Sequence, residues 1–296
     1  MLSAQRIKQL AREVGFHDCG IAKARPLHDF SLQLDDWLAG GHAGTMDYLR
    51  RNAEKRTDPA QLLPGAQSVV SLLLSYKPTQ TLSQPPLLAR YAYGEDYHTR
   101  IRPMLRQLAE HMLAEQPNQD TKLCIDTVPI SDKLWAREAG LGWIGRNTLL
   151  VHPLYGSFCH LAEIVTTAQF DLYDTPIEPR CGNCKLCVEA CPHTALMQAP
   201  HGTYLDAPRC RSYQTIESVQ VPAGASDGGK HDPASDYLFG CDLCQLACPY
   251  NSQSPTMRTI TDDDLALARR LTSAHGDEFV RLAQSTALSR VRYKNE

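Results

Sequence analysis

The sequence predicts an α+β protein in three parts: an N-terminal α/β domain over residues 1–173, a cysteine-rich module over 174–254 and a short helical tail over 255–296. Three observations predict this fold. Helical patterns alternate with buried-strand patterns up to about residue 170. Eight of the eleven cysteines then crowd between Cys181 and Cys248. Two amphipathic helical patterns, around residues 265–271 and 279–288, close the chain.

The N-terminal domain begins with a helix that Ser3 is in position to cap and Gly15 to end. The strand expected at residues 68–76 is a β-branched, apolar segment, which predicts burial on both of its faces. A long polar helix is expected at 97–115. The other predicted elements are a strand at 19–24, a helix at 30–38, a strand at 123–127 ending in a proline turn, a helix at 133–140 stopped by glycine, and strands at 147–153 and 162–167.

The composition sets limits on the possible partners. A net charge of −3 excludes a globally basic nucleic-acid binder, so any RNA contact must come from local patches. Solvated helix faces are the alternative interpretation of each patch. The candidate patches are Arg50, Arg51, Lys55 and Arg56; Arg100, Arg102 and Arg106; and Arg290, Arg292 and Lys294.

The chain shows no apolar stretch long enough to span a membrane and no secretory signal pattern at its N-terminus. We therefore expect a cytoplasmic protein without membrane contact. The absence of an obvious coiled-coil or dimer seam leads us to expect a monomer.

The first cysteine run has the spacing C-x2-C-x2-C-x3-C-P, with Cys181, Cys184, Cys187 and Cys191 as ligands. This is the bacterial ferredoxin pattern, in which three cysteines hold one [4Fe–4S] cube and the fourth reaches a second cube. The second run, C-x2-C-x3-C-P, supplies Cys241, Cys244 and Cys248, but Leu238 stands where a fourth cysteine is expected. Cys210 is the remaining cysteine between the runs, and we assign it as the eighth ligand.

The ligand sets are therefore expected to cross. Cluster one is assigned to Cys181, Cys184, Cys187 and Cys248, and cluster two to Cys191, Cys210, Cys241 and Cys244. A pair of zinc sites is the alternative for the two runs, and a buried structural thiol is the alternative for Cys210. The other three cysteines, Cys19, Cys124 and Cys159, lie in strand-like apolar surroundings and are interpreted as core thiols.

The cysteine-rich module has few apolar runs, so bound metal must supply much of its stability. Within it, residues 223–236 have the composition of a flexible loop. Two cubes indicate electron transfer, and the first 170 residues are expected to hold the site that the electrons reach. Neither a dinucleotide fingerprint nor a phosphate-binding loop is present, so that site is not an obvious NAD or ATP site.

Several segments together resemble one known family. They are RTDP (56–59), YGEDYH (93–98), DTVPISDKLWAREAGLGWIGRNTLL (126–150), SYQTIE (212–217) and GCDLCQLACPYN (240–251), with the cysteine runs. They closely resemble epoxyqueuosine reductases, the enzymes of the last step of queuosine synthesis in tRNA. The resemblance covers nearly the whole chain. It implies a cobalamin cofactor, two [4Fe–4S] clusters, and a substrate that is epoxyqueuosine at the wobble position (34) of a tRNA anticodon.

The resemblance also implies site residues. Asp126 matches the family's catalytic aspartate and is the expected proton donor, because the oxygen leaving the epoxide needs a proton. An aspartate that only caps a turn is the alternative. Structural roles are the alternative for each expected cobalamin contact, and His98 is not assumed to ligate cobalt. The expected cobalamin contacts are Arg56, Tyr97, His98, Asp126, Gly145, Arg146 and Asn147.

Asp132 stands where the family often has Glu, and Lys133 replaces the usual Arg, so we leave both out of the predicted site. Two further functions remain open: a non-catalytic two-cluster electron carrier, and another cobalamin reductase such as a reductive dehalogenase. The electron donor is expected to be of the flavodoxin or ferredoxin type, or a chemical reductant.

Overall fold

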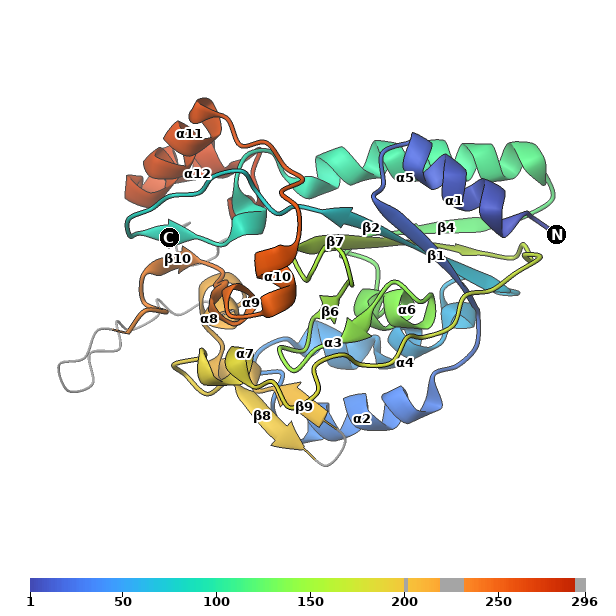
Figure 1. Ribbon diagram of the computed structural model, residues 1–296, viewed down its shortest axis with the longest axis horizontal. Helices are drawn as coiled ribbons and strands as arrows, with labels where there is room; N and C mark the ends of the chain where they lie inside the picture. Colours follow the sequence, from blue (N-terminus) through green and yellow to red (C-terminus); the bar gives the residue numbers. More distant parts are fainter. Residues whose placement is uncertain (200–201, 219–231, 291–296) are drawn as a thin grey trace.

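A four-stranded antiparallel sheet forms the centre of the N-terminal part, in a computed structural model that describes residues 1–199, 202–218 and 232–290 (Figure 1). The strand order is β1-β2-β7-β4. The strands are β1 (Asp18–Lys23), β2 (Ser68–Ser75), β4 (Thr121–Cys124) and β7 (Cys159–Thr166). The mixed helix-and-sheet class is confirmed. The pairing adds that the sheet is antiparallel, a direction that alternating patterns do not reveal.

Helices cover both faces of this sheet, which buries all eight residues of β2 as expected. On one face lie α1 (Ala4–Glu13) and α5 (Tyr97–Glu115), packed on apolar side chains of β1, β2 and β7 (Figure 1). Ser3 caps α1 by accepting a hydrogen bond from the Arg6 N–H, as the sequence predicts. On the other face lies α6 (Asp132–Glu138), with short segments of the first sixty residues around it. The helices in these first sixty residues, after α1, are α2 (His28–Ala39), α3 (Asp47–Arg51) and α4 (Ala53–Thr57).

The predicted strand at 123–127 is shorter than expected, because β4 ends at Cys124. The chain then turns at Asp126, whose φ of 46° lies in the left-handed region. Among non-glycine residues, Asp and Asn enter this region most readily. The strand expected at 147–153 is also short, since only Leu150–Val151 (β6) pairs, in a hairpin with Trp143–Ile144 (β5). Helix α6 ends before Gly140, which has a φ of +72°.

The cysteine-rich segment consists of short elements joined by turns. Its helices and strands are α7 (Leu186–Glu189), β8 (Leu196–Ala199), β9 (Gly202–Leu205), α8 (Arg211–Ile216), β10 (Tyr237–Phe239), α9 (Leu243–Leu246) and α10 (Pro249–Gln253). Strand β10 pairs in parallel with β3 (Leu87–Leu88) of the N-terminal part. The predicted flexible loop at 223–236 lies mostly outside the described residues, as do Arg292 and Lys294.

Both amphipathic patterns of the tail form helices, α11 (Asp262–Ser273) and α12 (Gly276–Ala283). Thr261 and Asp264 form a reciprocal capping box at the start of α11. The apolar faces of these helices share one core with β3 and with the segment that ends at Tyr93. The domain limits at 173/174 and 254/255 stay a prediction. In the part of the chain that the structure describes, no helix is both long and apolar enough to cross a membrane.

Candidate functional site

Asp126 lies beside a histidine that a second aspartate holds in place. Asp96 caps α5 by accepting from the His98 N–H at 2.9 Å, and its Oδ1 lies 2.7 Å from His98 Nδ1. On the other side of the ring, His98 Nε2 lies 3.4 Å from Asp126 Oδ2. The His98 side chain is buried at 7% exposed, whereas Asp126 is 45% exposed. A solvent-accessible carboxyl group is thus held in position by a buried imidazole, an arrangement suited to proton transfer.

A stack of rings continues from His98 into the protein. The Tyr97 ring centroid lies 4.0 Å from that of His98 and 4.3 Å from that of His160, which it stacks on at 12°. Burial, followed by Arg258 and Arg100, lowers the pKa of His160 to about 3, so its ring is neutral at physiological pH. Its Nε2 is buried and has no hydrogen-bond partner among the described residues. Such an orphaned group fits a polar partner supplied by a bound cofactor.

Arg56 lies close enough to Asp126 and Asp132 for both carboxylates to act on its charge. Burial lowers the pKa of its guanidinium, and its Nε is buried with no partner in the described part of the chain. The guanidinium carbon lies 5.8 Å from the centroid of the Tyr48 ring. Arg56, Tyr97, His98 and Asp126, four of the predicted site residues, are therefore neighbours in one site.

The other three predicted contacts, Gly145, Arg146 and Asn147, form a turn beside the first cysteine run. Arg146 Nη2 donates to the Gly182 carbonyl at 2.8 Å, and its Nε is buried without a partner among the described residues. Asn147 is 4% exposed, and its Nδ2 is also buried without a hydrogen-bond partner among the described residues. At Gly145, a Cβ atom would meet Asn147 Oδ1 at 2.7 Å. Packing is therefore already a sufficient reason for glycine at this position.

Trp143 joins this turn to a cysteine of the first run. Its ring is 1% exposed, and its Nε1–H donates to Cys181 Sγ at 3.4 Å. Arg180 lies over the same ring with its guanidinium carbon 5.8 Å from the centroid, and Tyr250 packs edge-on at 4.8 Å. Trp143 lies within the segment 126–150 that carries the family resemblance, but the sequence alone assigned no role to it.

The eight cysteines gather in two groups of four. Burial raises the pKa of Cys187 to about 11, and the thiols of Cys181, Cys248 and Cys184 add to this effect. Burial also raises the pKa of Cys244 well above its ordinary value, with further contributions from Cys241, Cys210 and Cys191. The thiols that act on Cys187 and on Cys244 are those assigned to cluster one and to cluster two, and the ligand sets stay a prediction. All eight thiols are free.

The eight cysteines do not form a site for a single metal ion in the described part of the chain. Across residues 1–199, 202–218 and 232–290, no three His, Cys, Asp or Glu side chains converge tightly enough for one metal ion. A cube holds its thiolates at four separate corners and does not require such convergence. Backbone donors also reach the sulfurs, since Ala195 N–H donates to Cys191 Sγ at 3.4 Å.

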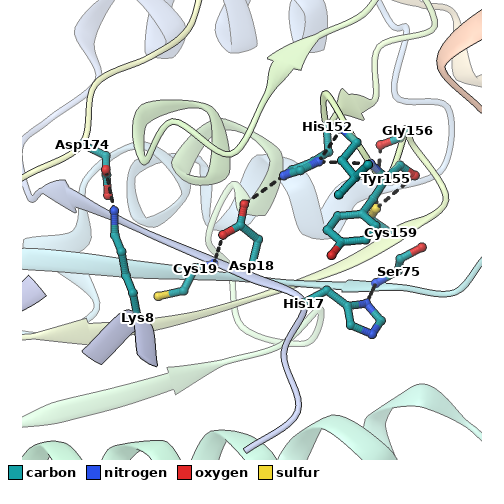
Figure 2. Close-up of polar contacts among 11 residues, drawn as sticks. Lys8, His17, Asp18, Cys19, Ser75, His152, Tyr155, Gly156, Cys159 and Asp174 are labelled. Carbon is teal, nitrogen blue, oxygen red and sulfur yellow. Dashed lines mark hydrogen bonds and ion pairs between the residues drawn. The ribbon is translucent and has the colours of Figure 1, made fainter. Parts of the chain in front are cut away.

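A second polar cluster anchors the turn that follows β6 (Figure 2). His152 Nε2 lies 2.9 Å from Asp18 Oδ2, and His152 Nδ1 accepts from the Leu154 and Tyr155 N–H groups. These acceptor contacts fix the ring proton on Nε2. Burial alone would raise the pKa of Asp18, but hydrogen bonds from His152 and from Cys19 N–H outweigh it and lower that pKa.

The three cysteines expected to be core thiols differ in burial. Cys19 and Cys124 are buried, with 3% and 0% exposure, and Cys159 is half-buried. The Cys159 thiol lies near the Tyr155 and Gly156 carbonyls, at 3.9 and 3.7 Å (Figure 2). Burial raises the pKa of all three thiols, so they stay protonated and unreactive.

The fold and the paired cysteine groups define an iron–sulfur oxidoreductase with a separate site around Asp126. Residues 180–251 match the family described as a 4Fe-4S double cluster binding domain, and residues 56–127 match the family described as Epoxyqueuosine reductase QueG, DUF1730. An epoxyqueuosine reductase of Leadbetterella byssophila is 39% identical over 251 residues, 84% of this chain and 80% of the relative. One of Cellulophaga algicola is 36% identical and covers 97% of this chain and 93% of the relative. The chain belongs to the epoxyqueuosine reductase family.

Solved structures agree with this assignment. A crystal structure of epoxyqueuosine reductase with an epoxyqueuosine-modified tRNA-Tyr stem loop has a TM-score of 0.80 at 28% identity, covering 98% of this chain and 78% of that chain. A Bacillus subtilis epoxyqueuosine reductase, whose catalytic aspartate loop is swung out of the active site, also has a TM-score of 0.80, at 27% identity over 98% of this chain and 78% of that chain. The family expected from the sequence is confirmed, and an enzyme is favoured over a simple electron carrier.

Proposed function

We propose that this chain reduces epoxyqueuosine to queuosine at the wobble position of tRNA, with cobalamin fed by two [4Fe–4S] clusters. The reaction consumes two electrons and two protons, breaks both C–O bonds of the epoxide, and yields a cyclopentene and water. When bound, cobalamin supplies a strongly reducing cobalt centre that no side chain provides. The chain's own residues must then bind the cofactor, orient the tRNA base and deliver protons.

The observation that carries this proposal is the alignment of Asp126. Its backbone is in the left-handed region just after β4, and its carboxyl oxygen lies 3.4 Å from His98 Nε2. His98 is itself fixed by Asp96 at 2.7 Å. A carboxylic acid held in this way can protonate the departing oxygen before the alkoxide closes the ring again. We assign Asp126 as the proton donor on this basis.

The residues present suit a cobalamin. The propionamide side chains of a corrin offer carbonyl oxygens and amide N–H groups, and several buried polar atoms in the described part of the chain have no partner. Those atoms are Arg56 Nε, Arg146 Nε, Asn147 Nδ2 and His160 Nε2. We propose that Arg56, Tyr97, His98, Gly145, Arg146 and Asn147 hold the cofactor beside Asp126, and that His160 belongs to the same site.

The route of the electrons follows from the turn at 143–147. Two hydrogen bonds, from Trp143 Nε1 and Arg146 Nη2, connect this turn to Cys181 and Gly182 of the first cysteine run. The same turn supplies three of the proposed cofactor contacts. The contacts support electron transfer from cluster one, on Cys181, Cys184, Cys187 and Cys248, to the cobalamin, with cluster two on Cys191, Cys210, Cys241 and Cys244 further upstream.

The partners follow from the reaction. The tRNA substrate indicates a cytoplasmic location. The clusters accept one electron at a time, which suits a one-electron donor of the flavodoxin or ferredoxin type. We expect the enzyme to act as a monomer.

Replacement of Asp126 by Asn tests the proposal. The Asp126→Asn variant keeps the shape of the side chain but cannot donate an acidic proton, so we expect single-turnover epoxide reduction on tRNA to fall by about 10²- to 10⁴-fold. The protein is reconstituted with iron, sulfide and cobalamin, and iron and cobalt contents must match those of the unmodified chain. Asp35→Asn, an exposed change in α2, is the matched control. Undiminished turnover in Asp126→Asn would exclude the assignment.

A further inference from the structure

A buried row of side chains crosses the sheet beneath α6. Gly20, Ser71, Glu163 and Cys124 are register partners on the neighbouring strands β1, β2, β7 and β4. Directly paired residues of antiparallel strands point to the same face of the sheet. The row therefore lies on one face, and α6 approaches it so closely at Gly20 that a Cβ there would collide with the Ala139 carbonyl. Ser71 and Glu163 are 0% exposed.

Polar atoms of this row and of α6, which packs on it, lack conventional partners. Both oxygens of Glu163, the Ser71 hydroxyl, Asp132 Oδ1 and Trp135 Nε1 are buried with no donor or acceptor assigned to them among the described residues. The Asp132 and Glu163 carboxyl groups lie within hydrogen-bond reach of each other. Two carboxylates can make that bond only if one of them carries a proton. An ionised Glu163 without such a bond would bear the full cost of burial.

Electrostatics agrees with one shared proton. Burial raises the pKa of Glu163 well above its ordinary value, and Asp132 raises it further. Burial also raises the pKa of Asp132, and Asp126 contributes to this shift. Two interacting carboxyl groups in a low-dielectric site release their protons in two separate steps, so the pair keeps one proton near neutral pH.

Both carboxyl groups lie near the segment that carries Asp126. Glu163 is paired with Cys124, two residues before Asp126, and Asp132 starts the helix six residues after it. Asp126 and Arg56 both act on the charge of Asp132. The titratable and charged groups that face the pair are Asp126 from the turn after β4, Arg56 from α4, Lys133 from α6 and Cys124 from β4.

We propose that Asp132 and Glu163 form a proton store that reprotonates Asp126 during turnover. Epoxide reduction consumes two protons, and Asp126 can deliver one each time it is protonated. In the proposed sequence Asp126 protonates the departing oxygen, takes the shared proton from the pair, and delivers it to complete the water. Solvent then reloads the pair. This inference rests on the proposed function, because it assigns the source of the second proton in that reaction.

The first test needs no substrate. Infrared spectra of the protein reconstituted with iron, sulfide and cobalamin, at pH 7, should show the carbonyl stretch of a buried, protonated carboxyl group. The band should disappear in Glu163→Gln, where the amide can donate to Asp132 but cannot carry the acidic proton. Ser71→Ala, which removes an unpartnered hydroxyl of the same row, should retain it. A wild-type spectrum without the band, or a band that survives in Glu163→Gln, would overturn the proposal whatever the protein's substrate is.

The second test uses the reconstituted enzyme. In Glu163→Gln, kcat on epoxyqueuosine tRNA should fall on the order of 10- to 100-fold at pH 8, with KM within about two-fold and a smaller loss at pH 6, where solvent protons are more abundant. A purely structural role would lower the melting temperature without changing the pH profile. If Glu163→Gln does not fold, Asp132→Asn replaces it with the same expectations. An unchanged kcat and pH profile in a folded variant would refute the proton store, while Asp126→Asn independently reports on the proposed function.

Discussion

Replacing Trp143 by Phe should lower the reduction potential of one of the two clusters. The indole N–H donates to Cys181 Sγ at 3.4 Å inside a site where the ring is 1% exposed. A hydrogen bond to a cluster sulfur becomes stronger when the cluster gains an electron, so it favours the reduced state. Phenylalanine keeps most of the aromatic packing against Tyr250 but cannot donate.

The size of the effect follows from the strength of this bond. Hydrogen bonds to charged groups contribute roughly 1.5–3 kcal/mol, and only the part gained on reduction affects the potential. If about 1 kcal/mol is gained, the potential falls by roughly 40 mV, since a tenfold change in a one-electron equilibrium corresponds to about 59 mV. The second cluster, held by the other group of cysteines, should keep its potential.

The assay is a redox titration of the reconstituted protein followed by electron paramagnetic resonance. Trp135→Phe is the matched control, because Trp135 is equally buried and its Nε1 has no partner among the described residues. It should leave both potentials unchanged while it alters the core to a similar degree. A shift below about 10 mV in Trp143→Phe, or a shift to higher potential, would refute the role of this hydrogen bond.

Two further predictions concern stability. Asn251→Ala should destabilise the protein by about 2–4 kcal/mol in urea unfolding. The Asn251 side chain is 2% exposed, accepts from Ser157 N–H at 2.6 Å, and donates to Ser157 Oγ and the Gln245 carbonyl. The control is the exposed change Ser252→Ala, which should cost little stability, and equal costs in the two variants would contradict the role of this network. Burial, then Arg258 and Arg100, lowers the pKa of His160 from 6.5 to about 3, so its contribution to stability is complete above pH 6.5 and is lost as the pH falls toward 3. The slope is at most about 1.4 kcal/mol per pH unit. His160→Gln should therefore reduce the difference between urea midpoints measured at pH 7 and pH 4.5, and an unchanged difference would show that His160 is not neutral in the fold.

The sequence predicts well those features that depend on spacing along the chain. The cysteine runs are local, so counting residues was enough to propose the two groups that the structure brings together. The long helix was predicted with both ends correct, at Tyr97 and Glu115, because its apolar positions and its flanking residues agree. The role of Asp126 came from the resemblance of its segment to a family, and not from its neighbours in the sequence.

The neighbours of buried groups in the sheet depend on which strands pair and in which register. Local sequence patterns do not predict this pairing. Glu163 appeared as one charged residue in an apolar strand pattern, which was a signal of an unusual buried group. Its neighbours Ser71 and Cys124 are about 90 and 40 residues away in the chain. Asp132 was left out because it departs from the family pattern, yet it faces Glu163. The two-residue strand β3 is too short for any periodicity to reveal.

The parallel pairing of β3 with β10 has a consequence for how the protein matures. Leu87 leaves the ribosome about 150 residues before its partner Tyr237. At 5–20 residues per second, this delay is roughly 8 to 30 s. During that time the N-terminal sheet can fold while the segment that ends at Cys241 has not yet closed against it. Strand pairing between distant segments forms late, so the cysteines from Cys241 onward can complete their groups only in this last stage of folding. We therefore expect cluster loading to accompany the docking of β10 and not to precede it.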